Sequence, residues 1–119
     1  LVLKVQQMHE SIIKKDYESA GSFLADNVEF RLEDGSTIEG KENCMKFMVE
    51  GYSSVEIEDY NVAVNLAVTG NNGDEWVLLW DNGTVTSADG TSSSFNWMES
   101  FQFENGKIVM MNQFSKPRN

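Results

Sequence analysis

The sequence is poor in the residues that cross-link a chain or hold a metal. It contains one cysteine, Cys44, and one histidine, His9, among 119 residues. A single cysteine excludes a disulfide within the chain, and no cysteine or histidine pair stands at metal-ligand spacing. The phosphate-loop pattern GxxxxGK and the nucleophile pattern GxSxG are also missing. We therefore expect no metal, no cofactor, and neither phosphate-loop nor serine-hydrolase chemistry.

Positive charge and long hydrophobic runs are scarce as well. Nine Lys and Arg face nineteen Asp and Glu, a formal charge of −10 that repels polyphosphate, so we expect no nucleic-acid partner. The longest apolar runs, such as Val62–Val68 with Asn65 inside it, are too short to span a bilayer, so we expect no membrane insertion. We favour a cytoplasmic location, and export stays open because Leu1 is not an initiator methionine.

What the sequence does contain is enough for one folded domain. The length of 119 residues, with 40% hydrophobic and 11% aromatic side chains, predicts a single domain over residues 1–119 with a substantial core.

Phe95–Phe114 predicts a long hairpin at the end of the chain. Asn105-Gly106 between two apolar runs is the strongest short signal for such a turn. Strand side chains alternate, so one carboxylate stands on the same face as four aromatic rings. This face comprises Phe95, Trp97, Glu99, Phe101 and Phe103.

The first half of the chain has helical spacing. Apolar residues recur every three or four positions from Val2 to Ile13, and Asp16 can cap a second helix over Tyr17–Ala25. A half-buried strand follows from Val28 to Leu32, and a third helix is predicted over Lys41–Glu50.

From Val55 onward the period changes to two, which predicts four long strands joined by hairpins. Strands segregated from helices indicate an α+β fold with an antiparallel sheet, whose helices cover one face. Long strands that bend around a helix would enclose a cone, and its open end would be a natural ligand cavity.

Three short motifs, in this order, resemble the nuclear transport factor 2-like superfamily and most closely its SnoaL-like branch. They are Phe23–Val28, Ile38–Lys41 before the third helix, and Phe101–Ile108 in the last hairpin. The resemblance covers essentially the whole chain. It implies a cystatin-like α+β barrel: a conical, curved antiparallel sheet wrapped around the N-terminal helices, with a deep pocket and often a dimer through the outer sheet face.

The superfamily includes ketosteroid isomerases, and the resemblance allows their catalytic positions to be located here. The tyrosine position falls on Met8 and the aspartate position on Leu32, neither of which can do acid or base chemistry. The oxyanion-acid position falls on Glu99. A carboxylate among aromatic rings would be desolvated and its pKa raised. Alternatively, Glu99 points outward to water or pairs with a basic residue such as Lys107, Lys46 or Arg31.

Two further residues are candidates for proton transfer. Cyclase-like and dehydratase-like relatives use a histidine–aspartate pair, and here His9 and Asp81 could form a dyad across the cone. We prefer simpler interpretations: a solvated His9 at the border of its helix, and Asp81 as the first residue of a turn, Asp81-Asn82-Gly83.

The sequence therefore favours a binding domain for a small hydrophobic or aromatic ligand. The expected lining of its pocket consists of Met8, Ile12, Leu32, Trp76, Trp80, Trp97, Phe101 and Met111. The alternative is a cofactor-independent isomerase, cyclase or dehydratase in which Glu99, Asp81 or His9 moves a proton on an enolisable substrate. A third possibility is an interaction module whose interior is filled with side chains.

A homodimer is expected from the resemblance and from one strand. Trp76, Leu78 and Trp80 alternate with Val77 and Leu79, so both faces of this strand are apolar. One face should line the core and the other should meet a partner, but the sequence leaves open which is which.

Overall fold

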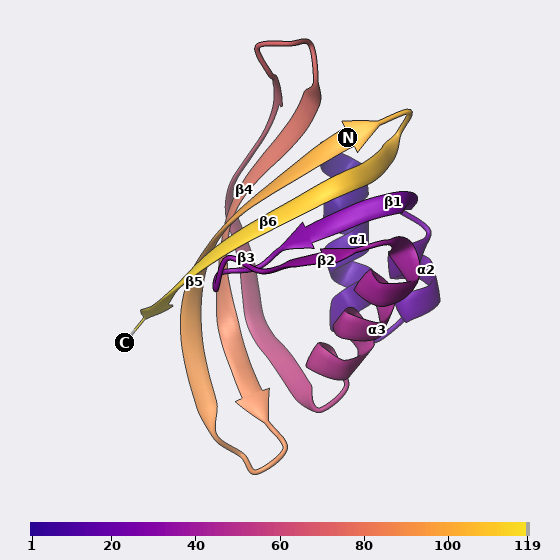
Figure 1. The fold of residues 1–119 in the computed structure, drawn as a ribbon. Helices are drawn as coiled ribbons and strands as arrows, with labels where there is room; N and C mark the ends of the chain where they lie inside the picture. Colours follow the sequence, from indigo (N-terminus) through magenta and orange to yellow (C-terminus); the bar gives the residue numbers. More distant parts are fainter. Residues whose placement is uncertain (119) are drawn as a thin grey trace.

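Three helices and six strands make up the computed structural model, which describes residues 1–118 (Figure 1). The helices are α1 (Val2–Ile13), α2 (Tyr17–Gly21) and α3 (Lys41–Tyr52). The strands are β1 (Leu24–Arg31), β2 (Thr37–Glu39), β3 (Val55–Thr69), β4 (Glu75–Ser87), β5 (Ser92–Glu104) and β6 (Lys107–Arg118).

The strands form one curved sheet, with the helices gathered on its inner side (Figure 1). The strand order is β2-β1-β6-β5-β4-β3, and every neighbouring pair is antiparallel except β1 with β6. The α+β fold predicted from the sequence is confirmed. The sheet is nevertheless mixed, because β1 runs parallel to β6. It is also unclosed, because β2 and β3 are edge strands that do not pair with each other.

The last hairpin forms as its turn signal predicts. Asn105 and Gly106 have φ values of 52° and 78°, the left-handed pair that a two-residue turn between twisted strands requires. Glu104 and Lys107 then pair directly across the hairpin. Along β5, Glu99, Phe101 and Phe103 are buried on the inner face, while Met98 on the opposite face is exposed.

Two predicted helix boundaries are wrong. The second helix ends at Gly21 and not at Ala25, because Leu24 already begins β1 and pairs with Ile108 on β6. The third helix passes through Gly51 and ends at Tyr52, which shows that a glycine inside a helix is tolerated. The short edge strand β2 was not predicted from the sequence.

The direction of the β4 side chains is settled by the sheet. Val77, Leu79 and Asp81 point into the core, with exposures of 0%, 2% and 3%. Trp80 points outward and is 50% exposed. The predicted turn at Asp81-Asn82-Gly83 is wrong, because β4 continues to Ser87 and Asp81 pairs with Trp97 on β5.

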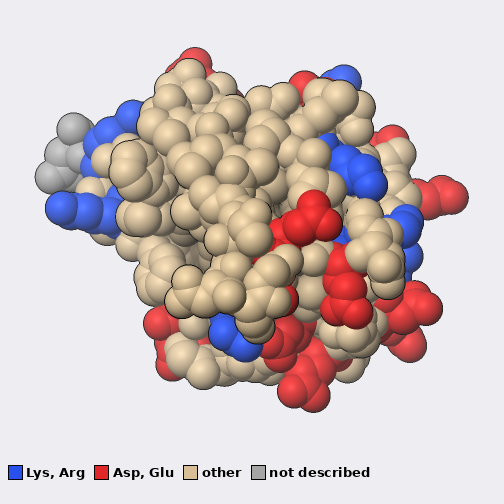
Figure 2. Space-filling view, turned by 90° about the horizontal axis from the view of Figure 1, so that it is seen from above, with Lys and Arg blue, Asp and Glu red and all other residues tan. Residues whose placement is uncertain are grey.

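The surface matches the acidic composition. Acidic side chains gather on one side of the face shown in Figure 2, and a broad area beside them carries no charge. Within residues 1–118, none of the helices has the length and apolar character needed to cross a membrane.

A substitution at Leu24 tests how much the packing of β1 beside β6 contributes to the free energy of unfolding. We expect Leu24→Ala to lower the free energy of unfolding by about 2 to 5 kcal/mol, because the 2%-exposed side chain would leave a cavity in the core. Leu3→Ala is the matched control, since Leu3 is 63% exposed and its loss should cost less than about 0.5 kcal/mol. Urea denaturation measures both, and equal effects would contradict this packing.

Candidate functional site

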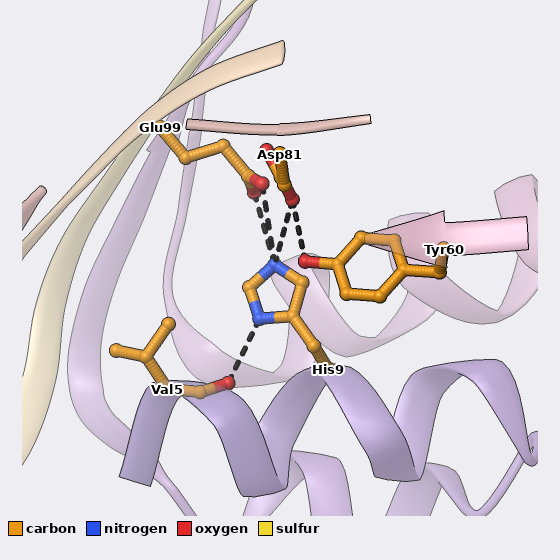
Figure 3. A network of polar contacts seen from close by, with 5 residues as sticks. All are labelled: Val5, His9, Tyr60, Asp81 and Glu99. Carbon is orange, nitrogen blue, oxygen red and sulfur yellow. Dashed lines mark hydrogen bonds and ion pairs between the residues drawn. The ribbon is translucent and has the colours of Figure 1, made fainter. Parts of the chain in front are cut away.

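Four polar side chains from four different elements meet on the inner side of the sheet (Figure 3). His9 comes from α1, Tyr60 from β3, Asp81 from β4 and Glu99 from β5. Asp81 and Glu99 are 3% and 8% exposed, and they are the two buried charged residues of the described part of the chain.

His9 joins the first helix to the sheet. Its Nδ1 lies 2.8 Å from the carbonyl oxygen of Val5, one helical turn earlier, and donates a hydrogen bond to it. Its Nε2 lies 3.2 and 3.3 Å from the two carboxylate oxygens of Glu99. With both ring nitrogens facing acceptors, the imidazole is held as a cation, because only His⁺ donates from both.

Asp81 is bonded through only one of its oxygens. The Tyr60 hydroxyl donates to Asp81 Oδ2 over 2.5 Å, and His9 Nε2 lies 4.0 Å from the same oxygen. Asp81 Oδ1 is buried and has no hydrogen-bond partner within residues 1–118. A buried acceptor without a partner is rare, so a proton, a water molecule or a ligand atom is needed there.

A β-bulge directs Tyr60 into the site. The pairing of β3 with β4 shifts between Glu58 and Asn61, and Asp59 adopts a left-handed φ of 52°. The extra residue lets Ile57 and Tyr60 both face inward although they are three positions apart. The Tyr60 ring then stacks on the His9 imidazole, with ring centres 5.8 Å apart and an interplanar angle of 15°.

The four side chains line a cavity of about 250 Å³ whose walls are mostly apolar. A volume of this size suits a small molecule rather than a steroid-sized one. The apolar wall is formed by Ile12, Ile13, Phe30, Leu32, Phe47, Met48, Tyr52, Ile57, Val85, Phe95, Trp97 and Met111.

His9 and Glu99 stabilise each other as charged groups. Burial is the largest single effect on His9 and lowers its pKa, but the charge and hydrogen bonds of Glu99, with smaller contributions from Val5 and Asp81, outweigh it and raise the pKa to about 9. Burial likewise raises the pKa of Glu99, but the charge and hydrogen bond of His9, with smaller contributions from Asp81 and Gln113, outweigh burial, so the net shift is downward. The raised pKa expected for Glu99 from its aromatic neighbours is therefore wrong.

Asp81 is the carboxyl group whose pKa is raised. Burial is the main cause, and the neighbouring negative charge of Glu99 adds to it, so the pKa reaches about 8 although Tyr60 and His9 oppose the shift. The pKa of Tyr60 is also raised, by burial and by its bond to Asp81, so its hydroxyl keeps its proton. At neutral pH the site thus holds a His9–Glu99 ion pair beside a largely protonated Asp81.

The same groups could hold a metal ion. His9, Asp81 and Glu99 each offer one ligand atom, and these atoms lie within 4.8 Å of one another. Three protein ligands are typical of catalytic metal sites. In the present geometry, however, both carboxylate oxygens of Glu99 lie within hydrogen-bonding distance of His9 Nε2. A proton on Nε2 accounts for this contact without a metal ion.

The structure brings together the three predicted catalytic residues, Glu99, Asp81 and His9. Of the predicted ligand-binding residues, four line the cavity: Ile12, Leu32, Trp97 and Met111. Met8 and Phe101 are fully buried in the core outside that lining, and Phe101 packs edge-on against the His9 ring at 5.6 Å.

Trp76 and Trp80 are not in the cavity, which corrects the placement expected from the sequence. Both lie on the outer face of β4, because Val77, Leu79 and Asp81 take the inner positions. Tyr60 was missed in the sequence. Strict alternation puts it on the opposite face from Ile57, and no pattern in the sequence predicts the β-bulge that turns both side chains inward.

Comparison with known proteins agrees with this fold. The sequence matches the SnoaL-like domain family over residues 5–111. No curated protein sequence matches the chain.

Similar solved structures share the architecture at low sequence identity. An LEH-like epoxide hydrolase from M. tuberculosis has a TM-score of 0.78 and 15% identity, and the match covers 97% of this chain and 81% of that one. A proposed SnoaL-like polyketide cyclase from Shewanella denitrificans has a TM-score of 0.78 and 12% identity, covering 96% and 88%. A proposed ketosteroid isomerase from Kribbella flavida has a TM-score of 0.74 and 14% identity, covering 99% and 78%.

The assigned protonation states predict how stability depends on pH. Folding raises the pKa of Asp81 from its ordinary value of 3.8 to about 8, and the pKa of His9 from 6.5 to about 9. Between these values the folded protein keeps protons that the unfolded chain has lost. Both contributions are complete below the ordinary values and are lost as pH rises through the folded ones. We therefore expect the free energy of unfolding to fall between about pH 5 and pH 9.

Urea denaturation at steps of pH measures this fall. Asp81→Asn should abolish the slope below about pH 6.5 and leave only the fall that His9 contributes between about pH 6.5 and pH 9. Asp89→Asn in an exposed turn should leave the slope unchanged. A stability that stays constant between pH 5 and pH 9 would contradict the protonation states given above.

Proposed function

The chain belongs to the SnoaL-like domain family, and on this basis we propose that its cavity binds a small apolar carbonyl compound and transfers protons on it without a cofactor. The observation that carries this proposal is the unpartnered Oδ1 of Asp81. A carboxyl group with a pKa of about 8 can give up and regain a proton near neutral pH, which is what a general acid requires.

Two features favour proton transfer over ligand binding alone. The cavity reaches Glu99, and a second titratable group, His9, lies 3.2 Å from it. Burying three ionisable groups in one apolar cavity is costly for a protein that needs only a hydrophobic pocket. The open cavity also argues against an interaction module with a filled interior.

The site contains an acid and a base in fixed positions. Asp81, neutral at pH 7, donates its proton to the carbonyl oxygen of the substrate, while the Glu99 carboxylate accepts a proton from the adjacent carbon. The products of this step are the enol, an Asp81 carboxylate and a protonated Glu99. Two carboxyl groups whose surroundings drive their pKa values apart are the usual basis of such a division of roles.

His9 allows the negative charge to move between the two carboxyl groups. Its Nε2 lies 3.2 Å from Glu99 and 4.0 Å from Asp81, so the imidazolium stays close to the charge before and after the transfer. Its position is fixed by Val5 and by the stacked ring of Tyr60. The cation therefore lowers the electrostatic cost of the step without exchanging its own proton.

The same pair of carboxyl groups also suits the opening of an epoxide by water, the activity named for the M. tuberculosis structure. Asp81 would protonate the epoxide oxygen, and Glu99 would accept a proton from the attacking water. The feature that favours this second candidate is again the Asp81 oxygen that has no hydrogen-bond partner within residues 1–118.

Hydrogen–deuterium exchange at carbon tests the proposal directly. With 1-indanone in D₂O, we expect the protein to accelerate exchange of the methylene protons beside the carbonyl, as followed by proton NMR. Asp81→Asn should slow this exchange by roughly 100-fold or more, because an amide cannot supply the proton. The rate should also fall as pH rises through about 8.

Asp89→Asn is the control, since Asp89 lies in an exposed turn remote from the cavity. Exchange that is equally fast in Asp81→Asn would overturn the assignment of the acid. Hydrolysis of styrene oxide without exchange of 1-indanone would favour epoxide opening.

The outer face of the sheet supports a homodimer as the functional form. Six apolar side chains on neighbouring strands form a continuous surface, hereafter the outer apolar face: Val64, Leu66, Leu78, Trp80, Met98 and Phe114. They are 36% to 60% exposed. Val64 pairs directly with Trp80, Trp80 with Met98, and Met98 with Phe114, and beside this row Leu66 pairs with Leu78. The face has no charged member, so two copies can meet there despite the charge of −10 on each chain.

Trp80→Glu tests this interface. A charge at the centre of the outer apolar face should weaken association by about 30-fold or more, as expected for a buried aromatic anchor. Leu3→Glu is the control, because Leu3 is at least as exposed as Trp80 but lies on α1. Sedimentation velocity measures both variants, and a wild-type protein that is monomeric at high concentration would rule the dimer out.

A further inference from the structure

A second buried polar atom without a hydrogen-bond partner lies at the start of α2. Within residues 1–118, two buried side-chain oxygen or nitrogen atoms lack a hydrogen-bond partner: Asp81 Oδ1 and the hydroxyl of Tyr17. The proton-transfer mechanism accounts for the first and makes no use of the second.

Tyr17 lies close to a tyrosine that faces the cavity. Tyr17 is the first residue of α2 and Tyr52 the last residue of α3, and these two helices are in contact. Lys15, just before α2, donates a hydrogen bond to the carbonyl of Ser53, just after α3, over 3.2 Å. This bond ties the chain segments that carry the two tyrosines to each other.

Tyr52 presents its hydroxyl to the cavity without a protein partner. Its side chain lines the cavity and is half-buried, and no hydrogen bond joins its hydroxyl to another group of the described chain. Burial, followed by the charges of Glu99 and Asp81 and the proximity of Tyr17, raises the pKa of Tyr52 to about 12. The hydroxyl is therefore a donor at every physiological pH.

The buried Tyr17 hydroxyl has no hydrogen-bond partner within residues 1–118, which is rare for a buried polar atom. The neighbouring Tyr52 is not fully buried and lines the cavity, so its hydroxyl is free to donate to a water molecule or to a polar ligand atom. We propose that the Tyr52 hydroxyl, supported by Tyr17, is a second polar subsite of the cavity, which binds a hydroxyl or carbonyl oxygen of the ligand. The substrate class is thereby narrowed to compact molecules with two oxygen functions. One oxygen meets Asp81, and the other meets Tyr52.

This inference deepens the function proposed above and rests on it. A hydrogen bond made to a buried donor is worth about tenfold in affinity when a ligand gains it. A ligand with one oxygen leaves the Tyr52 subsite to water, and a ligand with a second oxygen in the right position displaces that water.

The test compares 1-indanone with its monohydroxylated derivatives at each position of the aromatic ring. Dissociation constants are measured by isothermal titration calorimetry on the full chain. We expect one derivative to bind about tenfold more tightly than 1-indanone. In Tyr52→Phe this advantage should shrink to less than about twofold, while the affinity for 1-indanone itself changes little.

Phe47→Leu is the control, because Phe47 lines the same cavity but carries no hydroxyl, and the advantage should persist in it. Tyr17→Phe should reduce the advantage in part. Binding of 1-indanone with no gain from any hydroxyl group, or a gain that survives Tyr52→Phe, would overturn the subsite and leave the proton-transfer proposal intact. Failure of the whole series to bind would overturn both.

Discussion

The buried ion pair between His9 and Glu99 is the interaction on which the arrangement of the site depends. Neither group could remain charged in an apolar interior alone, since an isolated buried charge costs several kcal/mol. Together they are neutral, and the pair fixes the position of α1 against β5. The remaining carboxyl, Asp81, then has no cation of its own within hydrogen-bonding distance and stays protonated.

This balance shows why one carboxyl group cannot be understood without its neighbours. Glu99 and Asp81 are both buried, both acidic and on adjacent strands, yet their pKa values move in opposite directions. Burial raises both pKa values, but His9 opposes it far more strongly at Glu99, 3.2 Å from Nε2, than at Asp81, 4.0 Å away, and Glu99 itself adds to the rise at Asp81. In a medium of low dielectric constant, such a difference decides which acid loses its proton first.

Most of the fold could be predicted from the sequence, because it depends on patterns that are local. The Asn105-Gly106 turn and the alternating residues of β5 put Glu99 on the same face as Phe101 and Phe103, and the structure shows that this face is the inner one. The parallel pairing of β1 with β6 could not be predicted, since it joins segments about 80 residues apart through no local signal. Side-chain direction on β4 was equally open, because both of its faces are apolar.

The site itself was only partly within reach of sequence patterns. His9 and Asp81 were recognised as candidates, but a solvated His9 and a turn at Asp81 were simpler interpretations. They are excluded only by the folded sheet, in which β4 continues past Asp81 and His9 contacts Glu99. Tyr60 depends on the bulge at Asp59, and a bulge shifts which residues face inward without leaving a distinctive composition. The ligand cavity therefore emerges from the curvature of the sheet and not from any single motif.

The separation of His9 and Glu99 along the chain, 90 positions, has a consequence for synthesis in the cell. Helix α1 leaves the ribosome long before β5 is synthesised, so His9 at first has no Glu99 carboxylate to bind. Contacts between such distant segments form late and slowly, because the intervening loop must first be closed. The ion pair and the cavity can thus be completed only after β5 has been made, and until then His9 lacks the carboxylate that holds it in the folded protein.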